Sequence, residues 1–165
     1  MGQRIIDDNV VVDFVDDNGV TWFVDEDSNF TVDRPLRPFT DVTDGGWTDQ
    51  SGGTSLADAI GEDPVDDANY IKSSSSPSND ACEIALSDPP GALRSPVKVQ
   101  SRFRKEGTAA INLTVRLMQG ATQIATWTYT GISASFIDQE ETLTAPQVAA
   151  ITNANDLRLV FEATV

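Results

Sequence analysis

Hydrophobic and polar residues alternate along much of the C-terminal half of the chain. In residues 111–117 every second side chain is apolar: Ile111, Leu113, Val115 and Leu117. After a break at residues 119–122 the alternation returns in residues 123–130, where one face carries Ala125, Trp127 and Tyr129. A period of two is typical of a β-strand with one face buried. The two runs therefore predict an antiparallel hairpin with one face packed on the rest of the protein.

Further strands are predicted on both sides of this hairpin. The same alternation runs through residues 97–104 and 157–164, and shorter apolar runs occur at residues 70–71 and 84–86. One sheet of five or six such strands would leave its apolar face uncovered. We therefore expect an all-β fold, an antiparallel β-sandwich of two layers.

Two segments are predicted to form short helices that connect strands. Residues 142–156 offer Thr144 as a helix cap, Pro146 in the first turn, and residues 153–155 as the end of the helix. Residues 55–63 form a second candidate, with Gly61 as the stop signal.

The N-terminal segment has its own hairpin pattern. Alternating runs at residues 10–15 and 20–24 flank an Asn-Gly turn at residues 18–19. An isolated two-stranded hairpin is marginally stable in water. We expect this one to pack either on its own domain or on a neighbouring subunit, through the apolar residues Val10, Val12, Phe14, Val20, Trp22 and Val24.

A proline-containing connector is predicted to separate the hairpin from the rest. The sequence DRPLRPF at residues 33–39 holds two prolines and is typical of an extended linker. The predicted organisation is an N-terminal hairpin arm at residues 1–39 and a β-sandwich at residues 40–165.

Charge and composition narrow the function classes. The chain has 165 residues, 26 acidic against 11 basic, for a net charge of −15. Such a surface repels phosphate backbones, so nucleic-acid binding is disfavoured. No apolar run reaches the roughly 18 residues that span a bilayer, and the first residues lack the features of a signal peptide. We expect no membrane partner and no export.

The residue inventory also limits catalysis. Histidine is absent and Cys82 is the single cysteine, so His-dependent catalysis, Cys/His zinc sites and internal disulfides are excluded. Cys82 is predicted to be a small buried hydrophobe in a strand. Phosphate-binding loops and hydrolase motifs are absent as well. We therefore expect a protein that is not an enzyme and holds no cofactor.

One acidic segment has the spacing of a calcium loop. Residues 25–33 place oxygen ligands at its positions 1, 3, 5 and 9, namely Asp25, Asp27, Asn29 and Asp33. Phe30 stands where a calcium loop needs glycine, and Leu36 where it needs glutamate. A solvated acidic hairpin end is the stronger interpretation, and no metal is expected.

Carbohydrate chemistry is the remaining alternative. Paired carboxylates serve glycosidases, and acids gather in loops here: Asp44, Asp49, Asp58, Glu62, Asp63, Asp66 and Asp67. No motif fixes a pair of them at a defined spacing, so catalysis is not expected. Aromatic residues stack on sugars, but the mid-strand position of Trp127 favours core packing. Trp47 is the candidate ligand contact.

Several sequence elements resemble a module of structural proteins from tailed bacteriophages. In that module a Trp and a Leu-x-x-Ala-Ile element precede D-D-x-x-Y-I-x-S, a VRLMQG hairpin follows, and a DLRL-x-F strand closes it. The corresponding residues are Trp47, Leu56 to Ile60, Asp66 to Ser73, Val115 to Gly120, and Asp156 to Phe161. The resemblance covers residues 40 to 165 and does not extend to residues 1 to 39.

The resemblance implies a jelly-roll-like sandwich on a virion, as a head decoration or cement protein, a head fibre or a tail-associated protein. It implies no catalytic residues. A short chain with one sandwich favours a capsid decoration protein on the exterior of the head, made in the bacterial host cytoplasm and anchored by its N-terminal segment. Its expected partners are the major capsid protein and other virion proteins. It is also expected to form a homo-oligomer with sister copies, and a trimer is one candidate arrangement. The alternative is a head-fibre or tail-associated module that binds carbohydrate and adheres to the host.

Overall fold

The computed structural model describes residues 14–15, 21–22, 35–62, 64–89, 91–93 and 96–165. The chain divides into two compact units, Met1–Pro35 and Leu36–Val165. The second unit therefore begins four residues before the predicted boundary at residue 40. The reason is that Pro38 and Phe39, which the sequence placed in the connector, already belong to strand β3 (Pro38–Thr43).

The first unit contains a short antiparallel pair. Strands β1 (Phe14–Val15) and β2 (Thr21–Trp22) place Phe14 opposite Trp22. This pairing agrees with the predicted N-terminal hairpin. The other predicted contact residues, Val10, Val12, Val20 and Val24, lie outside the described residues, as do the calcium candidates Asp25, Asp27, Asn29 and Asp33.

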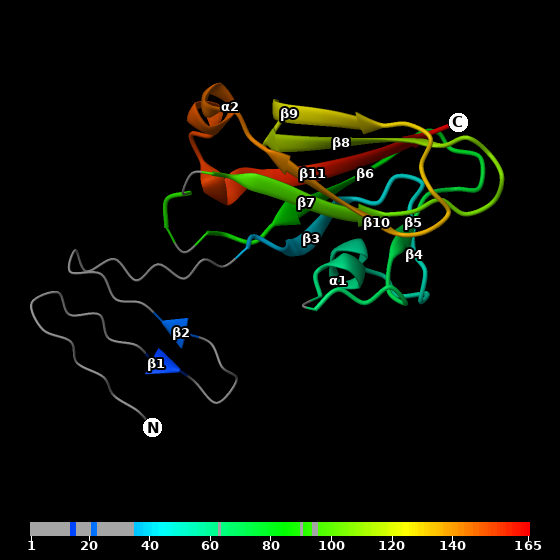
Figure 1. The fold of residues 1–165 in the computed structure, drawn as a ribbon, viewed down its shortest axis with the longest axis horizontal. Helices are drawn as coiled ribbons and strands as arrows, with labels where there is room; N and C mark the ends of the chain where they lie inside the picture. Colours follow the sequence, from blue (N-terminus) through cyan, green and yellow to red (C-terminus); the bar gives the residue numbers. More distant parts are fainter. Residues whose placement is uncertain (1–13, 16–20, 23–34, 63, 90, 94–95) are drawn as a thin grey trace, which may run out of the picture. The chain divides into compact units, whose positions relative to one another are not determined.

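The second unit is built on a five-stranded antiparallel sheet (Figure 1). Its order is β3, β6 (Ser78–Leu86), β11 (Leu157–Thr164), β8 (Asn112–Gln119) and β9 (Thr122–Tyr129). The hairpin predicted from the alternation in residues 111–130 is thus confirmed as β8–β9. Its turn contains Gly120 at φ +53°, a conformation that glycine adopts without steric cost.

A second, smaller antiparallel sheet lies over one face of the first (Figure 1). It consists of β7 (Lys98–Phe103) and β10 (Ile137–Thr142). Strand β10 was not predicted, because its sequence IDQEET carries one apolar residue. The burial of its residues nevertheless alternates. Gln139 and Glu141 occupy inward positions, where an alternating strand would normally carry apolar residues.

The core lies between the two sheets and beneath a short helix. Alternate residues of β8 and β11 face inward, among them Val115, Leu117 and Leu157, and they pack with Val99 and Phe103 of β7. A further cluster joins β6 to helix α1 (Leu56–Ile60) through Leu56, Ala57, Cys82 and Ile84. Cys82 is fully buried in its strand, as predicted.

Short elements connect the layers. Helix α1 is capped by Ser55 and followed by Gly61, as predicted. Helix α2 (Ala145–Ala150) has the predicted Thr144 cap and Pro146 in its first turn, but it ends at Ala150 and not at the predicted residues 153–155. A 3-10 turn, η1 (Ala154–Asp156), precedes β11, and β4 (Thr48–Asp49) pairs with β5 (Ile71–Lys72). No helix in the described part of the chain is long and apolar enough to cross a membrane.

These observations confirm an all-β fold built from antiparallel sheets. A jelly roll distributes eight strands over two sheets. Here five strands form the main sheet and β7–β10 covers part of one face. The jelly-roll topology therefore stays a prediction.

Candidate functional site

Trp47, the predicted ligand contact, is part of the packing between α1 and the main sheet. Its indole Nε1–H donates a hydrogen bond to the backbone oxygen of Asp80 at 3.0 Å. Its ring lies 6.4 Å from that of Phe161, at an interplanar angle of 49°. The side chain is half-buried against the clusters that contain Leu56 and Val115. The structure thus gives Trp47 a packing role, and ligand contact at this residue stays a prediction.

Two of the carboxylates that might have served catalysis are engaged in hydrogen bonds. Asp49 accepts from both the hydroxyl and the backbone N–H of Ser51, each at 2.7 Å, and these bonds lower its pKa. Asp67 is bonded to the Arg102 guanidinium, which lowers the pKa of this carboxyl as well. A general acid needs the opposite shift, a raised pKa. Neither group is therefore suited to donate a proton near neutral pH.

Asp66 and Asp44 make contacts within local turns. Asp66 accepts from the backbone N–H of Ala68 at 2.9 Å. Asp44 accepts a turn hydrogen bond through its backbone oxygen from the N–H of Trp47, and Asp63 lies outside the described residues. Within the described ranges no group of three acidic, His or Cys side chains is placed to hold a metal ion.

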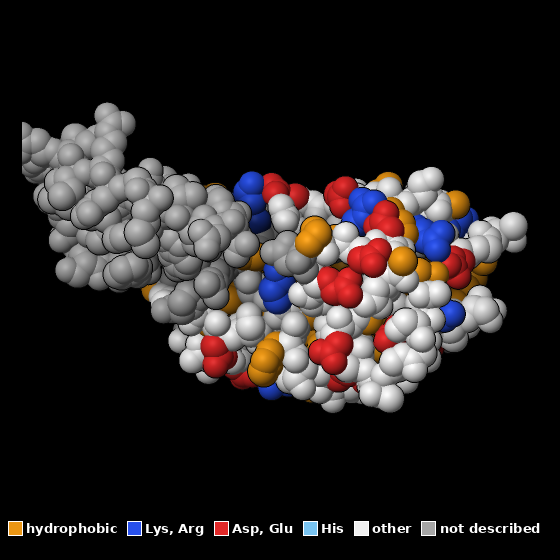
Figure 2. All heavy atoms as spheres, turned by 90° about the horizontal axis from the view of Figure 1, so that it is seen from below, with side chains coloured by type: hydrophobic (Ala, Val, Ile, Leu, Met, Phe, Trp, Pro, Cys, Tyr) orange, Lys and Arg blue, Asp and Glu red, His pale blue; other side chains and the backbone are white. Residues whose placement is uncertain are grey.

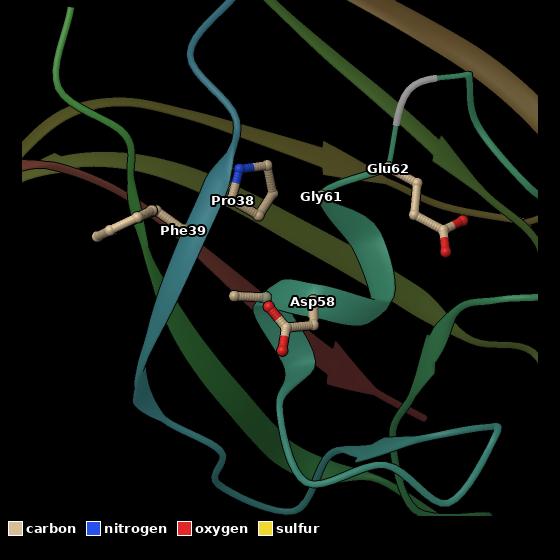
Figure 3. A pocket seen from close by; sticks show the side chains of 6 residues that line it. Pro38, Phe39, Asp58, Gly61 and Glu62 are labelled. Atoms are coloured by element: carbon tan, nitrogen blue, oxygen red, sulfur yellow. The ribbon is translucent and has the colours of Figure 1, made fainter.

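Asp58 and Glu62 line a shallow hollow between α1 and β3 (Figure 3). The hollow has a volume of about 330 Å³ and is open to solvent. Figure 3 shows the two carboxylates extending in different directions and the Phe39 ring pointing away from α1. The carboxylates of Asp58 and Glu62 are therefore not directed at a common reacting atom.

Helix α1 is held in place by a carboxylate of the neighbouring strand. Asp41 of β3 accepts hydrogen bonds from the backbone N–H groups of Leu56 at 2.9 Å and Ala57 at 2.6 Å. These donors belong to the first turn of the helix and have no partner within it. Asp41 thus joins the edge of the main sheet to the helix that covers Cys82 and Ile84.

A cluster of two arginines and two aromatic rings connects neighbouring loops to the outer face of the β7–β10 sheet. We call Arg102, Arg104, Tyr70 and Phe136 the arginine–aromatic cluster. Arg104 stacks over the Phe136 ring at 4.9 Å and over Tyr70 at 5.3 Å, and Arg102 lies 5.1 Å from the Phe136 centroid. Stacking of a guanidinium on an aromatic face is attractive because the ring face carries negative charge.

Carboxylates complete the arginine–aromatic cluster. Arg102 donates to both oxygens of Asp67, at 2.7 and 2.8 Å, and to Asp138 at 2.9 Å. Arg104 and the Tyr70 hydroxyl both donate to Glu106, at 2.8 Å. The bonds to Asp67 and Asp138 raise the pKa of Arg102 further above its ordinary value. The segment around residues 66–70 is thereby fixed to β7 and β10.

The face of the main sheet that points away from β7–β10 carries paired charges. Arg116 of β8 binds Glu162 of β11 at 2.5 Å, and Arg158 of β11 binds Glu83 of β6 at 3.1 Å. Each pair connects two neighbouring strands, and together the two pairs neutralise four charges on this face of the sheet. A different face, seen in Figure 2, shows acidic and basic side chains interspersed with scattered apolar ones.

Sequence reasoning missed the arginine–aromatic cluster. Its members come from residues 66–70, 102–106 and 136–138, which only the tertiary fold brings together. The available signal was the alternation in residues 97–104, which placed Arg102 and Arg104 on the exposed side of a strand. Nothing in the chain order indicated which carboxylates or rings would meet them.

Comparison with models of protein families, with curated proteins and with solved structures finds no match for this chain. The resemblance to phage structural modules therefore rests on the quoted sequence elements. In the structure those elements are the Trp47 packing site, α1, the segment through Tyr70, the β8–β9 hairpin and β11.

Proposed function

We propose that this chain is a structural protein of a tailed-bacteriophage virion, a capsid decoration or cement protein. In this proposal Leu36–Val165 forms a body on the exterior of the head, and Met1–Pro35 anchors it to the shell. The observation that carries the proposal is the division of the chain into these two units, with the β1–β2 pair in the smaller one.

The small unit is expected to need a partner surface for stability. A two-stranded hairpin alone buries too little to be stable in water. Its sequence alternates Val12 and Phe14 with Val11 and Val15, which places apolar residues on both faces of the predicted hairpin. Contact with a shell subunit would cover these residues, and an array of many copies gains from high effective concentration even when each contact is weak.

The larger unit suits an exposed structural body. Its loops are fixed by the arginine–aromatic cluster and its main sheet by cross-strand ion pairs such as Arg116–Glu162. Cys82 is the single cysteine and a free thiol, so the fold contains no internal disulfide and needs no oxidising compartment. The net charge of −15 favours solubility before assembly.

The test uses phage particles that lack the protein. Full-length chain and a truncation that starts at Leu36 are incubated with the particles, and occupancy is measured after sedimentation. We expect the truncation to melt cooperatively but to lose particle binding. Equal occupancy by the truncation would refute the anchor, and absence of binding by the full-length chain would refute the virion role.

A matched pair of substitutions refines this test. Phe14→Ala removes a predicted anchor contact, whereas Phe39→Ala removes a side chain that is 70% exposed on the body. We expect Phe14→Ala to lower occupancy and Phe39→Ala to leave it unchanged. Equal effects of the two substitutions would count against an anchor in the first unit.

The carbohydrate-binding alternative has less support because Trp47 is engaged in packing. Its Nε1–H is bonded to Asp80, and its ring contacts the cluster of α1. Saturable glycan binding that Trp47→Ala abolishes without unfolding the protein would favour this alternative over decoration.

A further inference from the structure

The main sheet has two edges, and they differ in how they are protected. The edge strands are β3 and β9 (Figure 1). An edge strand presents unpaired backbone N–H and C=O groups to any other extended chain. Natural proteins protect such edges with proline, charged side chains, β-bulges or a covering element.

The β3 edge is protected in several of these ways. Pro38 at its first position has no N–H to offer. Its pairing with β6 shifts register twice, between Pro38 and Thr40 and between Asp41 and Thr43. Helix α1 packs beside it, held by the Asp41 carboxylate. Addition of another strand along β3 is therefore disfavoured.

The β9 edge has little of this protection. Residues 117–137 contain no Asp, Glu, Lys or Arg over 21 consecutive positions, and no proline. A register shift between Leu117 and Met118 leaves Ile124 as a bulge, and pairing from Ala125 to Tyr129 is regular. Among the strands that the structure describes, none pairs with the outer side of β9.

The charge of the molecule indicates which partner fits this edge. Two copies of a chain with a net charge of −15 repel each other over most of their surfaces. The charge-free strand β9 is a place where two copies can approach without bringing like charges together. A strongly basic partner would gain nothing from this edge and would bind elsewhere.

The sequence of β9 is also complementary to itself. The side chains that point away from the core are threonines at every second position, namely Thr126, Thr128 and Thr130. In an antiparallel pair with Thr128 opposite its own copy, Thr126 lies opposite Thr130, and Trp127 lies opposite Tyr129. Threonine pairs and aromatic pairs are favourable across strands. The molecule already contains such a pair, because the Thr114 and Thr128 hydroxyls lie 3.2 Å apart.

We propose that β9 is an interface between two copies of this chain, which join antiparallel across a twofold axis with Thr128 opposite Thr128 and extend the two main sheets into one. This inference rests on the β9 edge and not on the virion role. Its test uses the purified full-length chain without particles, so its failure and that of the proposed function are distinguishable.

Oxidative cross-linking is a direct test of this register. Paired residues on antiparallel strands have Cα atoms about 4.5 to 5.5 Å apart, within the roughly 4.4 to 6.8 Å that a disulfide spans. Thr128→Cys should give a disulfide-linked dimer on mild oxidation. Thr114→Cys is the matched control on the same face one strand inward, and it should stay monomeric on a non-reducing gel. The native Cys82 is buried and does not compete.

Charge substitution tests the same contact without a covalent bond. The wild-type chain should sediment as a dimer, and Thr128→Lys or Thr128→Asp alone should sediment as a monomer, because each places like charges opposite each other. Mixing the two variants should restore the dimer, which excludes misfolding as the cause. A monomeric wild type, a dimeric Thr128→Lys variant, or absence of the Thr128→Cys cross-link would each overturn the proposal.

Discussion

Cys82 illustrates how burial decides the chemistry of a single residue. Its side chain is fully buried in β6, and burial raises the pKa of its thiol to about 12. The thiolate is the reactive form of cysteine, so the folded protein holds Cys82 in its inert form. Cys82 therefore serves as a packing residue of the core.

We therefore expect Cys82 to resist thiol reagents in the native state. A disulfide reagent at mildly alkaline pH should leave the folded protein unmodified and should react at once after denaturation in urea. The absorbance of the released reagent measures the difference. Fast stoichiometric reaction of the native protein would show that Cys82 is accessible.

Trp47 is the residue at which packing and ligand binding make opposite predictions. Trp47→Ala should lower the free energy of unfolding by about 3 kcal/mol, the lower end of the range for such truncations, because the ring is half-buried. Trp47→Phe retains a ring but loses the donor to the Asp80 oxygen, for a smaller loss of about 1 kcal/mol. Urea denaturation measures both. An unchanged stability of Trp47→Ala would mean that the ring is available for a ligand.

At the scale of the elements, alternation of apolar residues decided which strands were predictable. β8, β9 and β11 were predicted because each has one buried face and one exposed face. β10 was missed because Gln139 and Glu141 occupy its inward positions. Glu141 is tolerated there because its carboxylate accepts a hydrogen bond from the Tyr129 hydroxyl at 3.2 Å.

β3 was missed for a different reason. Its first residue is a proline, and DRPLRPF is typical of a linker. Proline is compatible with the start of an edge strand, where one side of the backbone has no partner strand. Which strand lies at an edge is a property of the assembled sheet, and local sequence does not contain it.

The attachment of α1 to β3 depends on Asp41. Replacement by Ala leaves the N–H groups of Leu56 and Ala57 without their acceptor, and hydrogen bonds to a charged group contribute about 1.5 to 3 kcal/mol. We expect Asp41→Ala to destabilise the protein by about 2 kcal/mol in urea denaturation. Asp58→Ala is the control, because its exposed side chain lies on α1 itself, and its effect should stay within about 0.5 kcal/mol.

The arginine–aromatic cluster predicts a local effect of a conservative substitution. Lysine at position 102 retains the charge but loses the planar fork that binds both oxygens of Asp67. We expect Arg102→Lys to speed amide hydrogen exchange in residues 66–70 and to leave exchange in β8 and β11 unchanged. If Arg102→Lys changed exchange by the same factor in residues 66–70 as in β8 and β11, the cluster would not be what holds this segment.

Acid should loosen the same segment. The pKa of Asp67 is lowered by Arg102, so the stabilisation from this pair is present above the ordinary pKa of an aspartate and is lost as the pH falls through the lowered value. Exchange of residues 66–70 should therefore rise at low pH before the core strands are affected. Because both side chains are substantially exposed, solvent screens the pair and the effect stays local.

At the scale of the whole molecule, the chain divides into two compact units, Met1–Pro35 and Leu36–Val165. The sequence predicted the all-β class, the β8–β9 hairpin and the presence of a separate N-terminal unit. It did not predict the arginine–aromatic cluster, whose members are distant in the chain, or the unequal protection of β3 and β9. Those features arise from contacts between segments, which a pattern of hydrophobic positions does not specify.

The proposal that this chain decorates a phage capsid is best tested by a three-dimensional reconstruction of phage particles. Particles that carry the wild-type chain are compared with particles assembled without it. The account predicts difference density on the exterior of the head, with the first unit against the shell and the body facing solvent. Particles without such density on the head, or with the density elsewhere on the virion, would contradict capsid decoration.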